Sequence, residues 1–246
     1  MKLILKILKW IGKILAGFII ILLISGLCFR LFSSKPVPPG KLVDVNGTNL
    51  HIRAEGQKNN FPTLILESGA GNDTDVFHWI AEGLKKNMRV IRYDREGKWF
   101  SEPSKDSITP EFYANQLHEL LEKNGEKPPY ILVGHSMGGY VALAFADLHP
   151  DNVKGLVLLN STARPDTEEK KVGRDRAIAV VKENHKSFIR TSIPMLFRSK
   201  CRKLYAGEIA LVKKEALKTS RQGIIAALEG MKLRLDREVL LHFGPY

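Results

Sequence analysis

The stretch that decides the fold is Gly134-His135-Ser136-Met137-Gly138-Gly139, because of the segments on either side of it. Residues 130–133 (Tyr-Ile-Leu-Val) are short and apolar, as in a buried strand. Residues 140–149 carry apolar side chains at helical spacing, and Pro150 ends that run. A serine between two glycines at a strand-to-helix turn is typical of a nucleophile elbow. The glycines leave room for a strained turn that lifts the Ser136 hydroxyl clear of the sheet.

The chemistry expected at this turn is attack by a serine hydroxyl. The helix that follows points free N–H groups and the positive end of its dipole at the same spot, which suits a developing oxyanion. A second interpretation stays open, in which the glycines only let a helix pack closely on the sheet.

Composition sets the broad class of the protein. The 246 residues are 44% hydrophobic and 26% charged, which is enough for one sizeable core. The net charge of +12 is uneven, with 19 bases against 10 acids in residues 164–246. No Gly-rich, aromatic-interleaved or zinc-type pattern accompanies these bases, so we expect no nucleic-acid partner, metal or cofactor. Cys28 and Cys201 provide no disulfide framework.

The N-terminal segment predicts a membrane anchor. Residues 11–29 contain one charge, Lys13, and are long enough to cross most of a bilayer. Lysines at positions 2, 6 and 9 precede the run, so the positive-inside rule keeps the N-terminus cytoplasmic and the body on the extracytoplasmic side. A cleaved signal peptide is the alternative, although Ser25-Gly26-Leu27-Cys28 offers no Ala-x-Ala site.

Five segments follow from the pattern of the whole chain. They are a basic flank and transmembrane anchor (1–35), a Pro-rich linker that would hold the body close to the bilayer (36–40), an α/β core (41–163), a helical lid (164–237) and the possible start of a seventh strand (238–246).

Strands and helices alternate in the core, which predicts a mostly parallel sheet covered by helices on both faces. The predicted strands lie at 42–45, 50–54, 63–66, 90–93, 130–133 and 153–159, the first two joined by the hairpin signal Asn46-Gly47. Helices are predicted near 76–87 and over 110–124, and the lid is expected to contain helices at 208–219 and 221–233. The functional site should lie at the carboxyl ends of the parallel strands.

With these features the chain resembles the α/β-hydrolase superfamily, in particular its lidded serine hydrolases. The resemblance covers residues 41–165 well and the lid loosely. Its motifs are Pro129–Gly139, Glu67-Ser68-Gly69-Ala70-Gly71, Tyr93-Asp94-Arg95-Glu96-Gly97, Ser101-Glu102-Pro103 and His149–Leu159.

The resemblance implies a role for several residues. Ser136 would be the nucleophile of a serine esterase acting on acyl substrates, and the backbone N–H groups of Met137 and Ala70 would form the oxyanion hole. His135 is expected to pack beside the elbow. Asp94 and Arg95 are expected to hold a loop through hydrogen bonds and an ion pair.

The chain also departs from the family pattern. In that family an acid follows the seventh strand and a histidine the eighth, and neither is recognisable after residue 238. Asn160 stands where some relatives carry the acid, and Trp99 stands where relatives usually carry glycine. Without further strands, the edge of the strand at 153–159 would lie open or be covered by something else.

Two hypotheses therefore remain. In the first, the chain is a membrane-anchored serine hydrolase of ester-like substrates. In the second, it is a catalytically deficient or truncated hydrolase-like protein that serves as a binding module or is a remnant.

Overall fold

The computed structural model describes residues 2–32, 37–71, 74–103 and 108–244. The chain forms two compact units, Met1–Pro38 and Pro39–Tyr246. The end of the predicted anchor and the first residue of the predicted linker (33–36) lie outside the described residues, as do residues 245–246.

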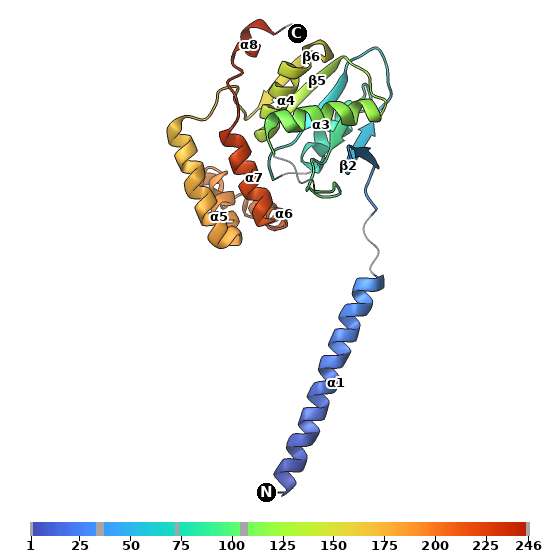
Figure 1. Cartoon of the computed structure of the whole chain (residues 1–246), viewed down its shortest axis with the longest axis vertical. Coiled ribbons are helices and arrows are strands. Elements are labelled where there is room, and N and C mark those ends of the chain that lie inside the picture. The colour runs from blue at the N-terminus through green and yellow to red at the C-terminus, as the bar shows by residue number, and fades with distance from the viewer. Residues whose placement is uncertain (1, 33–36, 72–73, 104–107, 245–246) are drawn as a thin grey trace. The chain divides into compact units, whose positions relative to one another are not determined.

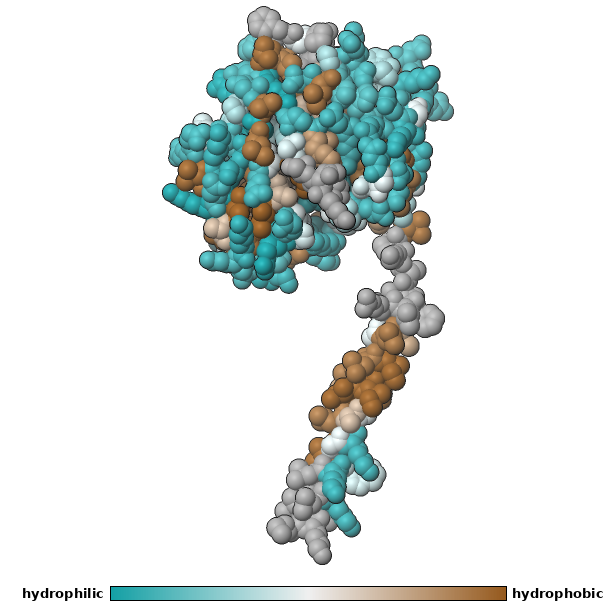
Figure 2. All heavy atoms as spheres, viewed as in Figure 1, coloured by the Kyte–Doolittle hydropathy of each residue, from teal (hydrophilic) through white to brown (hydrophobic). Residues whose placement is uncertain are grey.

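The first unit contains one long helix, α1 (Lys2–Phe32). Residues Lys9–Cys28 have a mean hydropathy of 2.4, and none of this stretch is buried within the described part of its own unit. Apolar side chains cover this part of the helix on the face seen in Figure 2. The helix is long and apolar enough to span a membrane, and a signal sequence at the N-terminus would share both properties.

The second unit is built on a six-stranded sheet with the order β1-β2-β4-β3-β5-β6 (Figure 1). The strands are β1 (Lys41–Val45), β2 (Thr48–Glu55), β3 (Thr63–Glu67), β4 (Val90–Tyr93), β5 (Tyr130–His135) and β6 (Val153–Leu159). β1 and β2 are antiparallel to their neighbours, and β4, β3, β5 and β6 run parallel. The predicted α/β fold with a mostly parallel sheet is confirmed.

The β1–β2 hairpin forms as its turn chemistry predicts. Asn46 and Gly47 have φ of 54° and 81°. Both central residues of the turn therefore occupy the left-handed region, which matches the twist of the two strands.

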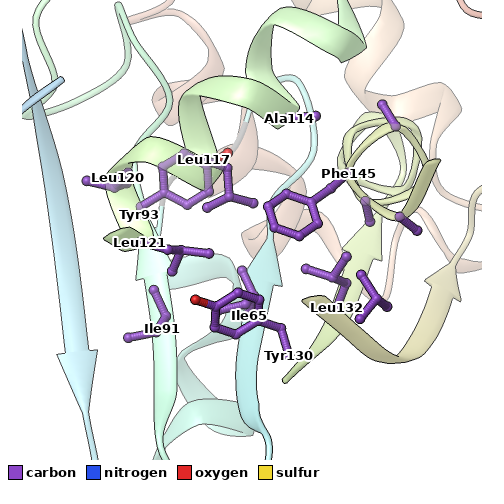
Figure 3. Close-up of a cluster of buried hydrophobic side chains, with 14 of the residues drawn as sticks. Ile65, Ile91, Tyr93, Ala114, Leu117, Leu120, Leu121, Tyr130, Leu132 and Phe145 are labelled. Atoms are coloured by element: carbon purple, nitrogen blue, oxygen red, sulfur yellow. The ribbon is translucent and has the colours of Figure 1, made fainter. Parts of the chain in front are cut away.

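Helices cover both faces of the sheet, and the side-chain alternation of the strands decides which residues meet them. The main core lies under α3 (Pro110–Lys123) and α4 (Met137–Leu148), where Ile65, Ile91 and Leu132 meet Leu117, Leu120 and Phe145 (Figure 3). The neighbouring strand residues point the other way, toward the short helices η1 (Thr74–Phe77) and α2 (His78–Leu84). That second cluster contains Leu64, Leu66, Val90, Val133, Phe77 and Ala81.

The predicted lid region is helical. It contains α5 (Glu168–Met195), η3 (Ser199–Cys201), α6 (Ala206–Ala216) and α7 (Arg221–Lys232). α5 packs on α7 through buried Ile178, Val181 and Ile225. The short helix η2 (Pro150–Asn152) joins α4 to β6 in the core.

The prediction of a seventh strand after residue 238 is wrong for the described residues, where Val239–Phe243 forms the one-turn helix α8. Arg237 explains the difference, because its guanidinium bonds Asp147 of α4 (3.0 Å) and Glu111 of α3 (2.7 Å). These bonds bring the segment to the helical layer, where Leu240 packs against the main core. Among the described residues the outer edge of β6 has no strand partner, and Val157 is 42% exposed there.

Phe145 tests whether the α3–α4 layer carries the stability of the fold. Its ring is fully buried beside Tyr130. We expect Phe145→Ala to lower the free energy of unfolding by about 3–5 kcal/mol, since it leaves a cavity in the main core. Denaturant titration of the full chain measures this loss. Phe61→Ala is the matched control, because Phe61 is 66% exposed and should cost under about 1 kcal/mol; equal losses would contradict the assignment of the core.

Candidate functional site

Ser136 lies at a strained turn between β5 and α4. Its φ of 54° and ψ of −119° are rare for a residue with a side chain. Three hydrogen bonds hold this conformation: Ser136 N donates to Leu159 O (3.0 Å), Gly139 N donates to Ser136 O (3.1 Å), and Ser161 Oγ donates to the same oxygen (2.7 Å). Strain of this kind persists only where the surroundings impose it, and it is common at active sites.

The glycines that flank the serine are required by close packing. A Cβ on Gly138 would lie 2.1 Å from the carbonyl oxygen of Glu67, and one on Gly134 would lie 2.5 Å from Gly139 Cα. Backbone therefore contacts backbone on both sides of the turn. The predicted elbow glycines let the start of α4 approach the end of β3.

The loop after β3 passes beside the elbow and is held by a buried arginine. Arg95 Nη1 donates to the Glu67 carboxylate and to Ser68 O (2.7 Å), and Nη2 donates to Gly69 O (2.6 Å). Both charged side chains are 1% exposed. Burial raises the pKa of Glu67, and the guanidinium opposes this effect. The prediction that Arg95 holds a loop is confirmed, and the loop is the one that carries Ala70.

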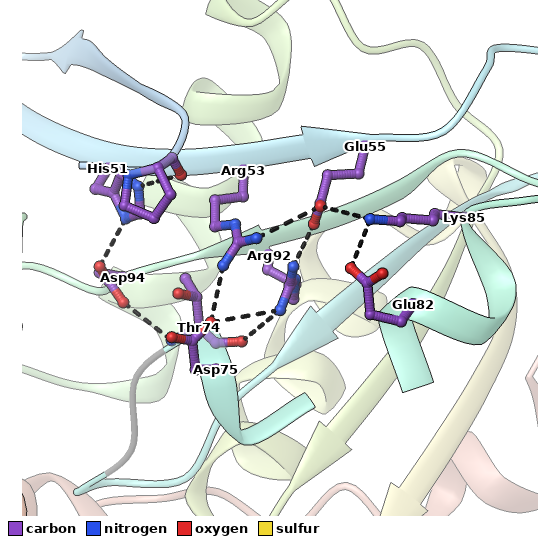
Figure 4. Close-up of polar contacts among 10 residues, drawn as sticks. His51, Arg53, Glu55, Thr74, Asp75, Glu82, Lys85, Arg92 and Asp94 are labelled. Carbon is purple, nitrogen blue, oxygen red and sulfur yellow. Dashed lines mark hydrogen bonds and ion pairs between the residues drawn. The ribbon is translucent and has the colours of Figure 1, made fainter. Parts of the chain in front are cut away.

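Asp94 holds the far end of the same loop (Figure 4). Its carboxylate accepts a hydrogen bond from Thr74 N (3.1 Å) and lies 2.7 Å from His51 Nδ1. Arg92 donates to Thr74 O (3.2 Å), and Arg53 donates to Asp75 (2.8 Å). These bonds attach residues 74 and 75 to β2 and to the end of β4, at the antiparallel side of the sheet. Asp94 therefore holds a loop through hydrogen bonds, as the sequence predicts.

The strained turn opens into a cleft of about 980 Å³ between the core and the lid. Ser136 is half-buried at its wall, together with Gly69, Ala70 and His135. Met137 is the first residue of α4, where backbone N–H groups lack partners inside the helix. The predicted nucleophile and the two predicted oxyanion donors therefore lie on adjoining segments, β5–α4 and the loop after β3.

The lid supplies an apolar wall to this cleft. Its residues there are Ile193, Leu196, Leu211 and Val212. From the core side, Trp99 lines the cleft with a φ of 45°, a left-handed conformation that glycine adopts readily. The ammonium of Lys218 in the lid lies 4.4 Å from the centre of the Trp99 ring, a cation–π contact between lid and core.

The histidines do not complete a catalytic pair with Ser136 in the described structure. Within that part of the chain, Ser136 Oγ has no hydrogen-bond partner. His135 lines the cleft, but its Nδ1 is buried without a partner among the described residues, and burial lowers its pKa. His51 is buried against Asp94, and His118 stacks on His149 with ring centroids 4.0 Å apart.

Sequence analysis missed two residues that position the site. Glu67 was noted only as part of a motif, yet its carboxylate meets Arg95 and its carbonyl oxygen lies against Gly138. Ser161 was not identified at all, although its hydroxyl holds the carbonyl of Ser136. An acidic residue at the end of a fully buried strand was the available signal for Glu67, because a buried carboxylate requires a partner.

Comparison with known proteins gives a family match across the core and the start of α5. The model of the alpha/beta hydrolase fold family matches residues 62–180. The span includes the loop after β3, the elbow and β6.

Solved structures of hydrolases match more of the chain. A thermophilic esterase from Thermogutta terrifontis is 29% identical with a TM-score of 0.71, over 84% of this chain and 75% of that one. The enol-lactonase of Burkholderia xenovorans LB400 is 25% identical with a TM-score of 0.70, over 80% and 75%. The uncharacterized hydrolase YraK of Bacillus subtilis is 31% identical over 47% of this chain and 42% of its own length. The chain spans about half the length of the curated relatives it matches.

Arg95 gives a direct test of how the site is held. We expect Arg95→Gln to lower the free energy of unfolding by about 3–5 kcal/mol, because it leaves the Glu67 carboxylate buried without its counter-charge. Arg164→Gln is the matched control, since Arg164 pairs with Glu238 at 71% side-chain exposure and should cost about 1 kcal/mol or less. Denaturant titration compares the two. Similar losses would show that the buried pair does not hold the loop.

Proposed function

Because the chain belongs to the α/β-hydrolase superfamily, we propose that it is a serine hydrolase that cleaves carboxylic esters or related acyl substrates through Ser136. The observation that carries the proposal is the position of Ser136 on a strained turn at the wall of a cleft, next to the loop that contains Ala70. The cleft combines the apolar lid residues with polar side chains that include Ser136, and this combination is typical of a site for a small organic substrate.

In the proposed reaction, Ser136 Oγ attacks the substrate carbonyl carbon and forms a tetrahedral intermediate. The backbone N–H groups of Met137 and Ala70 would donate to its oxyanion, and each such donor is worth about 3 kcal/mol of barrier. Collapse breaks the C–O bond of the ester, and the departing alkoxide takes up the proton that Ser136 lost and leaves as the alcohol. Water then hydrolyses the acyl ester on Ser136, which releases the carboxylic acid and restores the serine hydroxyl. The Arg95 bonds to the carbonyls of Ser68 and Gly69 support the loop that carries the second donor.

A serine hydroxyl also needs a base to accept its proton. Among the described residues no side chain forms a hydrogen bond with Ser136 Oγ. The alternative hypothesis, a hydrolase-like protein without efficient catalysis, is not favoured, because the esterase and the enol-lactonase that match about four fifths of this chain are hydrolases.

We expect Ser136→Ala to abolish both labelling by a fluorophosphonate probe and hydrolysis of p-nitrophenyl butyrate, the latter by at least about 1000-fold. The reason is that only this hydroxyl is placed at the strained turn. Ser187→Ala on the exposed face of α5 is the matched control and should keep both signals. Equal labelling of the Ser136→Ala variant would overturn the assignment. A folded wild-type chain that neither labels nor hydrolyses the ester would favour the alternative hypothesis.

We further propose that α1 anchors the protein in a membrane, with the N-terminus cytoplasmic and the body on the other side. The support is the apolar stretch Lys9–Cys28 and the lysines that precede it. This arrangement would give the cleft access to substrates outside the cytoplasm or in the bilayer.

Cysteine accessibility in intact cells tests this orientation. In a full chain carrying Cys28→Ser and Cys201→Ser, we expect Asn60→Cys to react with a membrane-impermeant maleimide before permeabilisation, because Asn60 is an exposed residue of the body. Lys6→Cys in the same background is the control and should react only after permeabilisation. The reverse pattern would contradict the orientation. If the mass of the mature chain shows that α1 has been removed, then the segment is a cleaved signal peptide and not an anchor.

A further inference from the structure

The junction between α5 and α6 exposes large apolar side chains. We call residues 195–205 the lid tip. Within it Met195, Leu196 and Leu204 are 74%, 75% and 75% exposed. Single exposed apolar residues are ordinary on protein surfaces, but three in eleven residues at this degree of exposure indicate a surface that is covered in use.

The lid tip is also strongly basic. Arg198, Lys200, Arg202 and Lys203 are all exposed. No acidic residue occurs between Glu183 and Glu208, and none of these four bases forms an ion pair among the described residues. Arg202 donates to the carbonyl of Phe197 (3.2 Å), which ties one base to the backbone of the tip. Unpaired positive charge therefore surrounds the exposed apolar side chains.

We propose that the lid tip docks on the bilayer leaflet that faces the body, and that this leaflet contains anionic lipids. Apolar side chains that enter the headgroup boundary, flanked by bases that meet anionic headgroups, are the features of interfacial membrane binding. The lack of acidic residues across this segment favours an anionic partner surface. The apolar helix α1 in the same chain is an independent reason to expect a bilayer nearby.

Docking would also orient the cleft. Leu196 belongs both to the lid tip and to the wall of the Ser136 cleft, where Ile193, Leu211 and Val212 continue the apolar surface. An acyl chain that leaves the bilayer at the lid tip would thus meet an apolar path toward Ser136. This step rests on the proposed function and assigns the substrate class as acyl esters dissolved in a membrane.

A fluorescent probe in the lid tip tests the docking without using activity. The full chain with Cys28→Ser, Cys201→Ser and Leu204→Cys is labelled with an NBD fluorophore and reconstituted into phosphatidylcholine vesicles. The vesicles contain a doxyl-labelled quencher lipid, with or without about 30 mol% phosphatidylserine. We expect a blue shift and quenching by about half or more when phosphatidylserine is present. A probe at Asn60→Cys is the matched control and should stay unquenched.

The second part of the experiment tests whether docking depends on the four bases of the lid tip. Adding Arg198→Gln, Lys200→Gln, Arg202→Gln and Lys203→Gln should return the lid-tip probe to the level of the Asn60 probe. If the probe is not quenched in vesicles that contain phosphatidylserine, the proposal is overturned. The tip would then bind another protein or nothing. Quenching that survives the four substitutions overturns it as well, since docking would then not depend on anionic lipid.

Measurements of ester hydrolysis test the path of the substrate through the lid tip separately from the docking. Relative to the wild type, the same four substitutions should lower turnover of a long-chain ester carried in the vesicles by about tenfold and leave hydrolysis of soluble p-nitrophenyl acetate unchanged. Equal effects on both esters would overturn the route through the lid tip. No hydrolysis by any variant would instead count against the proposed function, while the fluorescence result still decides the docking.

Discussion

The site depends on one buried ion pair, between Arg95 and Glu67. The guanidinium holds the end of β3 and two carbonyl groups of the loop after it. The same residue, Glu67, presents its carbonyl oxygen to the position where Gly138 has no side chain. The Ser136 turn and the loop that carries Ala70 are therefore positioned by a common residue, so the proposed nucleophile and the proposed oxyanion donors are set relative to each other before substrate arrives.

Local pattern was sufficient for much of the fold. The apolar strand before Ser136, the helical spacing after it and the Asn46-Gly47 turn each specify their own conformation over a few residues, and all three are present. The partner of Arg95 was not predictable in this way, because Glu67 lies 28 positions away and meets it only once β3 and β4 pair. The topology of the fold decides which buried charges meet over a long sequence separation. The local hydrophobic periodicity of the sequence does not determine this topology.

For the segment after residue 238, the local sequence pattern itself was ambiguous. A short apolar run such as Val239-Leu240-Leu241 fits a strand or a helix equally well. Arg237 decides between them by bonding acids on α3 and α4, which brings Leu240 to the helical layer. The role of Trp99 likewise depends on contacts that the sequence does not show. Its backbone has the left-handed conformation that suits glycine, and its ring is held by the contact with Lys218.

The backbone N–H and C=O groups of Ser136 both form hydrogen bonds with residues at or just after the end of β6. Leu159 accepts from the amide of Ser136, and Ser161 donates to its carbonyl. β6 is also the last strand in the order, with its other edge unpaired within the described chain. A displacement of β6 would therefore shift the backbone of Ser136 through these two hydrogen bonds, so a ligand bound at this edge of the sheet would change the position of the proposed nucleophile.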